Sequence, residues 1–214
     1  MKIAPSILSA DFMNLEQEIQ RINNTDVEWI HLDVMDGNFV QNITFGLSLI
    51  KRISEMTNKS LDVHLMVKHP QNLVEQLCEL NISYITIHIE ILQNVDFVYL
   101  KNICQKKNIT LGLAINPDTK IEDYKEYLNK INYILLMSVE PGKSGQSFKP
   151  EVLDKVKEIR KLENGKNIII NIDGGINQDT IKQIKQTTID VVVSGVYLFD
   201  GDMQQNINKL RISK

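Results

Sequence analysis

Short runs of isoleucine, valine and leucine alternate along the chain with longer segments in which apolar residues recur every three or four positions. Continuous apolar runs predict β-strands that are covered on both faces, and the longer segments predict amphipathic helices. A helical segment follows each run, for example at residues 13–22 and at residues 152–162. We expect eight strands, at residues 3–7, 29–34, 60–66, 84–88, 110–115, 133–138, 168–173 and 191–195.

Residues that commonly begin helices support several of the predicted helices. Asp11 precedes the first helical segment, residues 116–118 (Asn-Pro-Asp) precede the fifth, and Asn177 precedes the seventh. Side-chain oxygens of Asp and Asn accept hydrogen bonds from the first free N–H groups of a helix. Strand and helix therefore alternate through the sequence, and no linker, low-complexity tract or change of composition interrupts them.

Eight repeats with the strand first and the helix last predict an α/β fold of the closed (β/α)8 type, a TIM barrel. We expect residues 1–214 to form this barrel as a single domain. An open, doubly wound sheet is the alternative, because the same alternation also builds that fold. However, no G-x-G-x-x-G turn follows the first strand, and an open sheet does not need polar residues at the ends of nearly all its strands. Both observations favour the barrel.

The charge and the apolar content of the chain limit its partners. The formal net charge is −3, so the chain lacks the excess of basic residues with which proteins bind nucleic-acid phosphates. No apolar stretch reaches the length of about 20 residues that spans a membrane, and the amino terminus does not resemble a signal peptide. Neither Cys78 nor Cys104 belongs to a C-x-x-C pair, so we expect buried free thiols. We therefore expect a cytoplasmic protein without nucleic-acid or membrane partners.

Polar side chains interrupt the second predicted strand, where residues 31–36 read HLDVMD. Successive side chains of a strand point to opposite faces, so His31, Asp33 and Met35 share one face, and Asp36, on the other, is expected to be structural. Burying an imidazole or a carboxylate without a partner is costly. In a barrel, catalytic groups sit at the carboxyl ends of the strands. Other predicted strands also end in polar residues, namely Ser6, His64, His88, Glu90 and Asp173.

Two imidazoles and two carboxylates in this set, those of His31, Asp33, His64 and Asp173, predict a metal site. The mixture of nitrogen and oxygen ligands suits one divalent ion of zinc, iron, manganese or cobalt. A single histidine on an apolar strand is more often a hydrogen-bonded core residue. The convergence of four such groups on one barrel mouth favours the metal site.

Other residues near the strand ends leave two interpretations open. His88 is expected to support the site through a hydrogen bond, and Glu90 either does the same or has an ordinary surface or capping role. Met35, Met66 and Met137 are either core filler or an apolar lining that excludes water from a carbanion-like intermediate.

Three glycine-containing loops follow the last three predicted strands. They read PGKSGQSF at 141–148, IDGGIN at 172–177 and SGV at 194–196. In barrels, the loops after the last two strands and a short extra helix commonly bind a phosphate group. Each loop alone is a weak signal, since tight turns have similar sequences. Together and in these positions they predict a phosphate site.

Several motifs in this order resemble the ribulose-phosphate 3-epimerase family from residue 3 to about residue 200. The resemblance implies a TIM barrel of the ribulose-phosphate-binding type. It also implies an isomerase that interconverts D-ribulose 5-phosphate and D-xylulose 5-phosphate in the pentose phosphate pathway. The motifs are PSILSADF (5–12), HLDVMDGNFVQNITFG (31–46), LDVHLMV (61–67), MSVEPGKSGQSF (137–148) and DGGI (173–176).

The resemblance also implies roles for particular residues. His31, Asp33, His64 and Asp173 match the metal ligands of the family, and Asp33 and Asp173 match its acid/base pair. One carboxylate on each face of a planar enediolate inverts C3 without either group moving. Ser6 and His64 match substrate contacts. The positions that match the phosphate-side loops are Gly142, Lys143, Ser144, Gly145, Gly174, Gly175, Gly195 and the adjacent Val196.

The chain departs from the family pattern on the phosphate side. GKSG stands where GFGG is usual, so Lys143 adds charge toward a phosphate and Ser144 narrows the conformations open to the turn. Val196 removes a hydroxyl that would contact phosphate. A 3-epimerase of another ketose phosphate, such as D-allulose 6-phosphate, and a catalytically silent phosphosugar-binding barrel are therefore alternatives, and a homo-oligomer is an expectation of the resemblance. Further departures are Asn38 for His, Gln41 for Pro and Asn171 for Glu.

Overall fold

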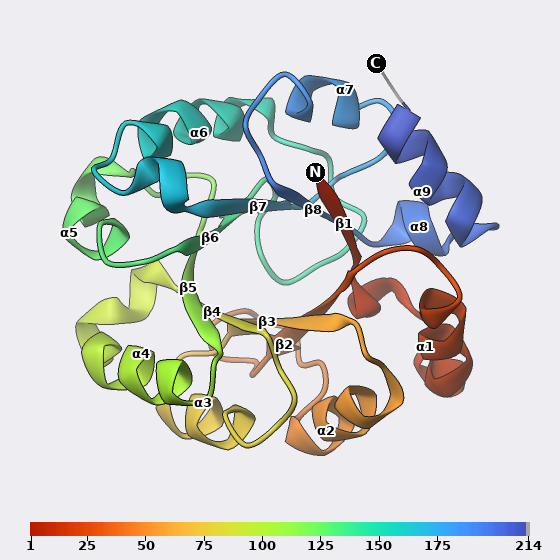
Figure 1. Ribbon diagram of the computed structural model, residues 1–214, viewed down its shortest axis with the longest axis horizontal. Coiled ribbons are helices and arrows are strands. Elements are labelled where there is room, and N and C mark those ends of the chain that lie inside the picture. The colour runs from red at the N-terminus through yellow and green to blue at the C-terminus, as the bar shows by residue number, and fades with distance from the viewer. Residues whose placement is uncertain (213–214) are drawn as a thin grey trace.

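The computed structural model describes residues 1–212, which form eight parallel strands around a central axis with helices outside them (Figure 1). Each strand from β2 to β7 pairs with the strand that follows it, and β8 pairs with β1. A bridge between Ser6 and His31 connects the first strand to the second. The strands are β1 (Lys2–Pro5), β2 (Trp29–Met35), β3 (Ser60–Met66), β4 (Tyr84–His88), β5 (Thr110–Ile115), β6 (Tyr133–Met137), β7 (Ile169–Asp173) and β8 (Val191–Ser194).

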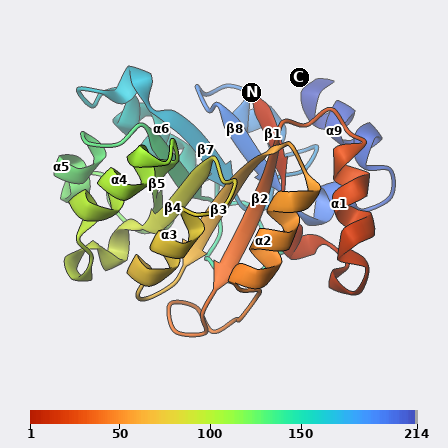
Figure 2. The same cartoon turned by 60° about the horizontal axis from the view of Figure 1, so that its bottom comes forward.

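Helices lie between successive strands and cover the outside of the barrel; in Figure 2, α2 and α3 lie in front of β2 and β3. None of the helices within residues 1–212 has both the length and the apolar character needed to cross a lipid bilayer. The helices are α1 (Leu15–Asn23), α2 (Leu47–Met56), α3 (Gln71–Leu77), α4 (Phe97–Lys106), α5 (Lys125–Leu128), α6 (Leu153–Arg160), α7 (Ile181–Ile184), α8 (Val196–Phe199) and α9 (Met203–Ile212). Short 3₁₀ helices occupy Ile7–Ser9, Phe12–Asn14, Ile89–Asn94, Glu122–Tyr124, Pro150–Val152 and Gly165–Asn167.

The two faces of each strand have different surroundings, as β2 illustrates. Leu32 and Val34 point outward and belong to the main hydrophobic cluster, which also contains helix residues such as Ile50. Burial of each such side chain contributes about 1.5–3 kcal/mol. His31 and Asp33 point to the interior of the barrel, where both are almost completely buried. Alternation along one strand therefore supplies the core with one face and the site with the other.

Aromatic side chains close the barrel interior near the amino ends of the strands. The rings of Trp29 and Tyr84 stack with centroids 4.1 Å apart, and Trp29 also packs against Tyr133. Gly112 on β5 makes room for this packing, because a Cβ atom there would lie 2.6 Å from the Tyr133 ring. With this end filled, the polar residues at the carboxyl ends surround the open end.

The structure confirms the predicted (β/α)8 barrel and all eight of its strands. The alternative of an open sheet is wrong, because the Ser6–His31 bridge joins the first and second strands. The largest difference is at β1, which ends at Pro5 rather than at residue 7. There the Ser6 Oγ atom accepts a hydrogen bond from the Leu8 N–H and caps a 3₁₀ turn.

Candidate active site

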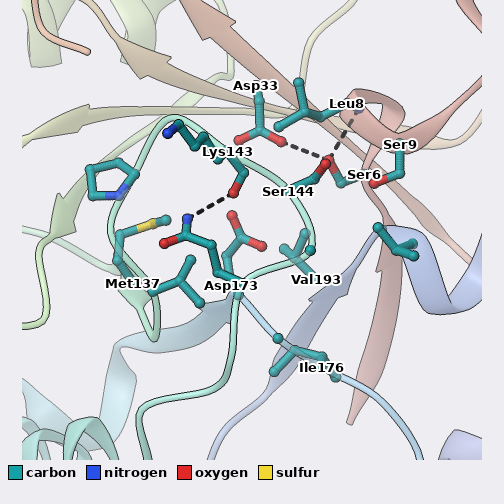
Figure 3. A pocket seen from close by; sticks show the side chains of 18 of the residues that line it. Ser6, Leu8, Ser9, Asp33, Met137, Lys143, Ser144, Asp173, Ile176 and Val193 are labelled. Atoms are coloured by element: carbon teal, nitrogen blue, oxygen red, sulfur yellow. Dashed lines mark hydrogen bonds between the residues drawn. The ribbon is translucent and has the colours of Figure 1, made fainter. Parts of the chain in front are cut away.

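A cavity of about 350 Å³ opens at the carboxyl ends of the strands (Figure 3). Asp33 and Asp173 lie at its floor and point toward one another from β2 and β7. Residues 142–145, 174–175 and 195–196, from the loops after β6, β7 and β8, line its outer wall. The cavity therefore brings the predicted acid/base pair and the predicted phosphate loops together.

The four predicted metal ligands form one compact cluster. Each of His31, Asp33, His64 and Asp173 offers one ligand atom, and these four atoms all lie within 4.8 Å of one another. Asp33 Oδ1 lies 3.0 Å from His64 Nδ1 and 3.3 Å from His31 Nε2. Asp173 Oδ2 lies 3.9 Å from the same His31 nitrogen. Strands β2, β3 and β7 therefore hold the whole set at the barrel axis.

The surroundings of His31 fit a divalent ion. His31 Nδ1 lies 2.8 Å from the carboxylate of Asp62, so its other nitrogen, Nε2, is directed into the cluster. This Nε2 atom is buried and makes no hydrogen bond within residues 1–212. A ligand histidine commonly has its outer nitrogen held by a carboxylate in this way. Two imidazole nitrogens and two carboxylate oxygens suit zinc, iron, manganese or cobalt.

A second hydrogen-bonded chain supports His64 from behind. His64 Nε2 lies 2.9 Å from His88 Nε2, and His88 Nδ1 lies 3.0 Å from Glu90 Oε2. The other Glu90 oxygen accepts hydrogen bonds from the Asn116 N–H and the Thr119 hydroxyl. The expected hydrogen-bonding role of His88 is confirmed, and the open question about Glu90 is answered in favour of support rather than a surface role.

The two aspartates of the floor have opposite electrostatic surroundings. Burial alone would raise the pKa of Asp33, but the adjacent imidazoles of His31 and His64 outweigh it and hold that pKa well below its usual range. Ser6 also donates a 2.6 Å hydrogen bond to Asp33 Oδ2. For Asp173, burial and the nearby Asp33 carboxylate raise the pKa to about 7. Environments that separate the pKa values of two carboxyl groups are typical of acid/base pairs.

The remaining side chains of the strand ends have structural and lining roles. Met35, Met66 and Met137 are buried and also line the cavity, so they are core residues and an apolar lining at once. Asp36 faces away from the cluster and accepts hydrogen bonds from three backbone N–H groups. It shapes the loop after β2, as its position on the opposite face predicted.

Glycines give the loops of the outer wall their shape. The backbone φ angle is positive at Gly142, Gly145, Gly174 and Gly175, a conformation that side chains disfavour. Ser144 does not adopt a positive φ angle, so the turn does not need a glycine at this position.

Three of the predicted substrate contacts differ in their access to the cavity. Lys143 is exposed and lines the cavity, and Val196 also lines it with 53% of its surface exposed. His64 is fully buried behind Asp33 and does not reach the cavity surface.

The sequence prediction did not assign Asp62, Tyr133 or Asn171 to the site. Asp62 contacts His31 of the four-residue cluster, and Tyr133 and Asn171 contact Asp62. Asp62 and Asn171 precede His64 and Asp173 by two positions, so the alternation of strand side chains places them on the same interior face. The motif alone did not show that they meet, because they come from distant segments.

A closed barrel with buried carboxyl groups below glycine-rich loops is the architecture found in phosphosugar-binding (β/α)8 barrels. Comparison with known proteins identifies the branch. Residues 2–199 match the ribulose-phosphate 3 epimerase family, and the chain therefore belongs to this family. It is an enzyme of the isomerase class, and the family epimerises a pentulose phosphate at C3.

Curated relatives cover nearly the whole chain. A ribulose-phosphate 3-epimerase of Helicobacter pylori is 40% identical over 94% of this chain and 92% of its own length. One from Bacillus subtilis is 32% identical over 100% of both chains. The similarity thus includes every strand and loop that builds the site.

Solved structures of lower identity share the fold. KGPDC from Streptococcus mutans, in complex with D-R5P, matches with a TM-score of 0.71 at 10% identity, over 99% of this chain and 97% of its own. Tryptophan synthase subunit alpha from Campylobacter jejuni matches with a TM-score of 0.59 at 19% identity, over 99% and 93%. At these low identities, both comparisons show a shared barrel fold and nothing about function.

Proposed function

We propose that the chain interconverts D-ribulose 5-phosphate and D-xylulose 5-phosphate, with Asp33 and Asp173 as its two acid/base groups. One observation carries the proposal: two carboxyl groups with opposite electrostatic surroundings face one cavity whose outer wall is made of glycine-rich loops. The phosphate group of the substrate lies against the glycine-rich loops. The C3 atom of the sugar lies between the carboxyl groups of Asp33 and Asp173.

Inversion at C3 needs proton transfer on both faces of the same carbon. The C3 proton is acidic because it is next to the C2 carbonyl group. The ionised carboxylate of Asp33 takes this proton from one face, and the carbon skeleton becomes a planar enediolate. Asp173, on the opposite face, returns a proton to C3 from that side. The roles exchange in the reverse direction, so no proton acceptor other than the two carboxylates is needed.

His31, Asp33, His64 and Asp173 would hold one divalent ion next to the reacting carbon. When bound, the ion supplies positive charge that stabilises the developing negative charge on the substrate oxygens. Ser6 holds the Asp33 carboxylate in place through its 2.6 Å hydrogen bond and contacts the substrate from the cavity wall. His64 is buried, so it acts on the substrate only through Asp33 and the ion.

The phosphate side binds through backbone and charge. The N–H groups of loops 142–145, 174–175 and 195–196 surround the phosphate, as glycine-rich loops do in other barrels. Lys143 adds one positive charge at the cavity wall. Lys143 and Val196, which depart from the family pattern, therefore affect the affinity for the phosphate group. Proton transfer depends on Asp33 and Asp173 at the cavity floor.

A substrate panel tests the proposed reaction. We expect the purified, zinc- or manganese-loaded protein to convert D-ribulose 5-phosphate with a higher kcat/KM than D-allulose 6-phosphate. A clear preference for D-allulose 6-phosphate would replace the proposed substrate. Absence of turnover with both sugars, together with retained sugar-phosphate binding, would indicate the silent barrel.

The cysteines favour a reducing compartment. Cys78, directly after α3, and Cys104 on α4 are buried free cysteines with sulfur atoms 3.7 Å apart. Disulfides form readily between neighbouring cysteines in oxidising compartments and are rare in the cytosol. A cytoplasmic location is consistent with this pair and with a metabolic substrate.

A further inference from the structure

A layer of buried polar side chains lies immediately below the metal cluster, on the axis of the barrel. It consists of Asp62 from β3, Tyr133 from β6 and Asn171 from β7, and each of the three residues is 0% exposed. These residues do not line the cavity, so they do not touch the substrate. Buried polar groups need hydrogen-bond partners, and the chemistry of each group decides which atom donates and which accepts.

One carboxylate oxygen of Asp62 is the common acceptor of the layer. Asp62 Oδ2 accepts hydrogen bonds from the Tyr133 hydroxyl at 2.7 Å and from the Asn171 amide nitrogen at 3.1 Å. The same amide nitrogen lies 2.8 Å from the Tyr133 oxygen. His31 Nδ1 is the third partner of the Asp62 oxygen, at 2.8 Å.

These contacts fix which nitrogen of His31 faces the cluster. A carboxylate oxygen accepts hydrogen bonds, so the His31 Nδ1 atom beside it donates. The Nε2 atom is then the one whose lone pair is available to a metal ion, and it is directed toward Asp33 and Asp173. In register, Asp62 lies directly opposite His31 on the neighbouring strand, so strand pairing enforces the contact.

We propose that Asp62 is a positioning residue for His31, and that Tyr133 and Asn171 hold Asp62 in the orientation that presents His31 Nε2 to a divalent ion. The inference rests on the metal site of the proposed function. It adds three residues to that site, and none of them is a ligand itself.

Two details of the chain support this arrangement. A Cβ atom at Gly112 would lie 2.6 Å from the Tyr133 ring, so the glycine leaves the space that lets Tyr133 reach the axis. Asn171 stands where the family resemblance gives Glu, and only the amide carries N–H donors. A carboxylate at residue 171 would place a second negative charge beside Asp62, whereas the amide donates to it.

Zinc binding to near-isosteric variants tests the proposal. For Asp62→Asn we expect the affinity for Zn²⁺, measured by competition with a chromophoric chelator, to fall about 10 to 100-fold. Tyr133→Phe and Asn171→Asp should weaken zinc binding less, in the same direction. Thr86→Val is the matched control, because Thr86 is a buried interior residue whose hydroxyl has no hydrogen-bond partner within residues 1–212. Its zinc affinity should equal that of the wild type.

Thermal unfolding of the metal-free proteins separates positioning from simple structural support. A purely structural role predicts lower metal-free stability in Asp62→Asn and Tyr133→Phe with zinc affinity unchanged, and this result would overturn the proposal. If Asp62→Asn does not fold, nitrogen NMR of the zinc-loaded wild type decides. We expect a proton on His31 Nδ1 and zinc on Nε2, and the reverse assignment would contradict the account.

The outcomes also separate this inference from the proposed function. A wild-type protein that does not bind zinc would overturn both the positioning role and the proposed metal site. Normal zinc binding by Asp62→Asn would overturn the positioning role alone, and the epimerase activity of the wild type would stand.

Discussion

The floor of the cavity is made of strand side chains, to which we assign the proton transfer, whereas the outer wall is made of loops, to whose backbone we assign phosphate binding. On the floor, Asp33 is 3% exposed and pairs with neighbours on adjacent strands. On the wall, Lys143 and Val196 are exposed, and the loop conformations depend on glycines with positive φ angles. The floor is fixed by register, and the wall by backbone conformation.

This difference between floor and wall predicts which kinetic constant a mutation in each region should change. A change on the floor alters groups near the reacting carbon and should act mainly on kcat. A change on the wall alters contacts with a non-reacting part of the substrate that persist through the reaction, so it should act mainly on KM. Mutations that violate this division would show that the two regions are not separate.

Removal of either floor carboxylate should have the largest effect. We expect Asp33→Asn and Asp173→Asn each to lower kcat by about 10² to 10⁴-fold, the contribution typical of a positioned acid or base. Steady-state kinetics with D-ribulose 5-phosphate measure this, and zinc content is determined in the same samples. A variant with full zinc and a normal kcat would remove that aspartate from the mechanism.

Removal of the metal ion should lower the stability of the folded protein, because the ion would be held by the side chains of the cavity floor. Zinc at about 100 times its dissociation constant stabilises the folded state by about 2.7 kcal/mol. This corresponds to an increase of about 5–10 °C in Tm for a domain of this size. Calorimetry with and without a chelator measures the difference. Equal Tm values, with zinc present in large excess, would argue against a metal site on the floor.

A methyl group on the wall should weaken substrate binding. Gly175 has a φ angle of 65°, and a Cβ atom there would lie 2.5 Å from the Phe148 backbone nitrogen. Gly175→Ala therefore strains the loop by about 1–3 kcal/mol, and we expect a higher KM with normal zinc affinity.

Gly46→Ala is the matched control, because no atom lies within 4 Å of the position that a methyl group would take there. An unchanged KM in Gly175→Ala would show that this loop does not hold the phosphate.

The charge of Lys143 should have the smallest effect. An exposed charge contributes about 0–1 kcal/mol, so Lys143→Ala should raise KM about fivefold at most and leave kcat and Tm unchanged. Lys143→Arg keeps the charge and should keep the KM. Equal KM values for all three proteins at low ionic strength would exclude Lys143 from phosphate binding.

Sequence alone predicted the barrel from its eight strand–helix repeats, and it predicted the four clustered side chains because each of them lies at the carboxyl end of a barrel strand. His31 and Asp33 share a face by their spacing, and apolar partners fill the other face. The layer beneath them was missed for a physical reason. Asp62 meets Tyr133 and Asn171 across the barrel interior, from strands that are not its neighbours. These hydrogen bonds depend on the register of the closed barrel and on the space at Gly112.

The loops were predicted as a group, but their details depend on backbone angles. A serine fits at residue 144 because the chain places its positive φ angles at Gly142 and Gly145. A sequence pattern indicates that a turn needs glycine, but the turn geometry decides which position needs it.

Hydrogen exchange at C3 in D₂O tests the central claim most directly. The wild type should exchange the C3 proton of both D-ribulose 5-phosphate and D-xylulose 5-phosphate, followed by NMR. In a two-base mechanism each zinc-loaded variant, Asp33→Asn or Asp173→Asn, keeps one base on one face. Each should therefore exchange only one of the two sugars, and the two variants should exchange opposite sugars. Exchange of both sugars by either variant, or of the same sugar by both, would contradict proton transfer by these two aspartates.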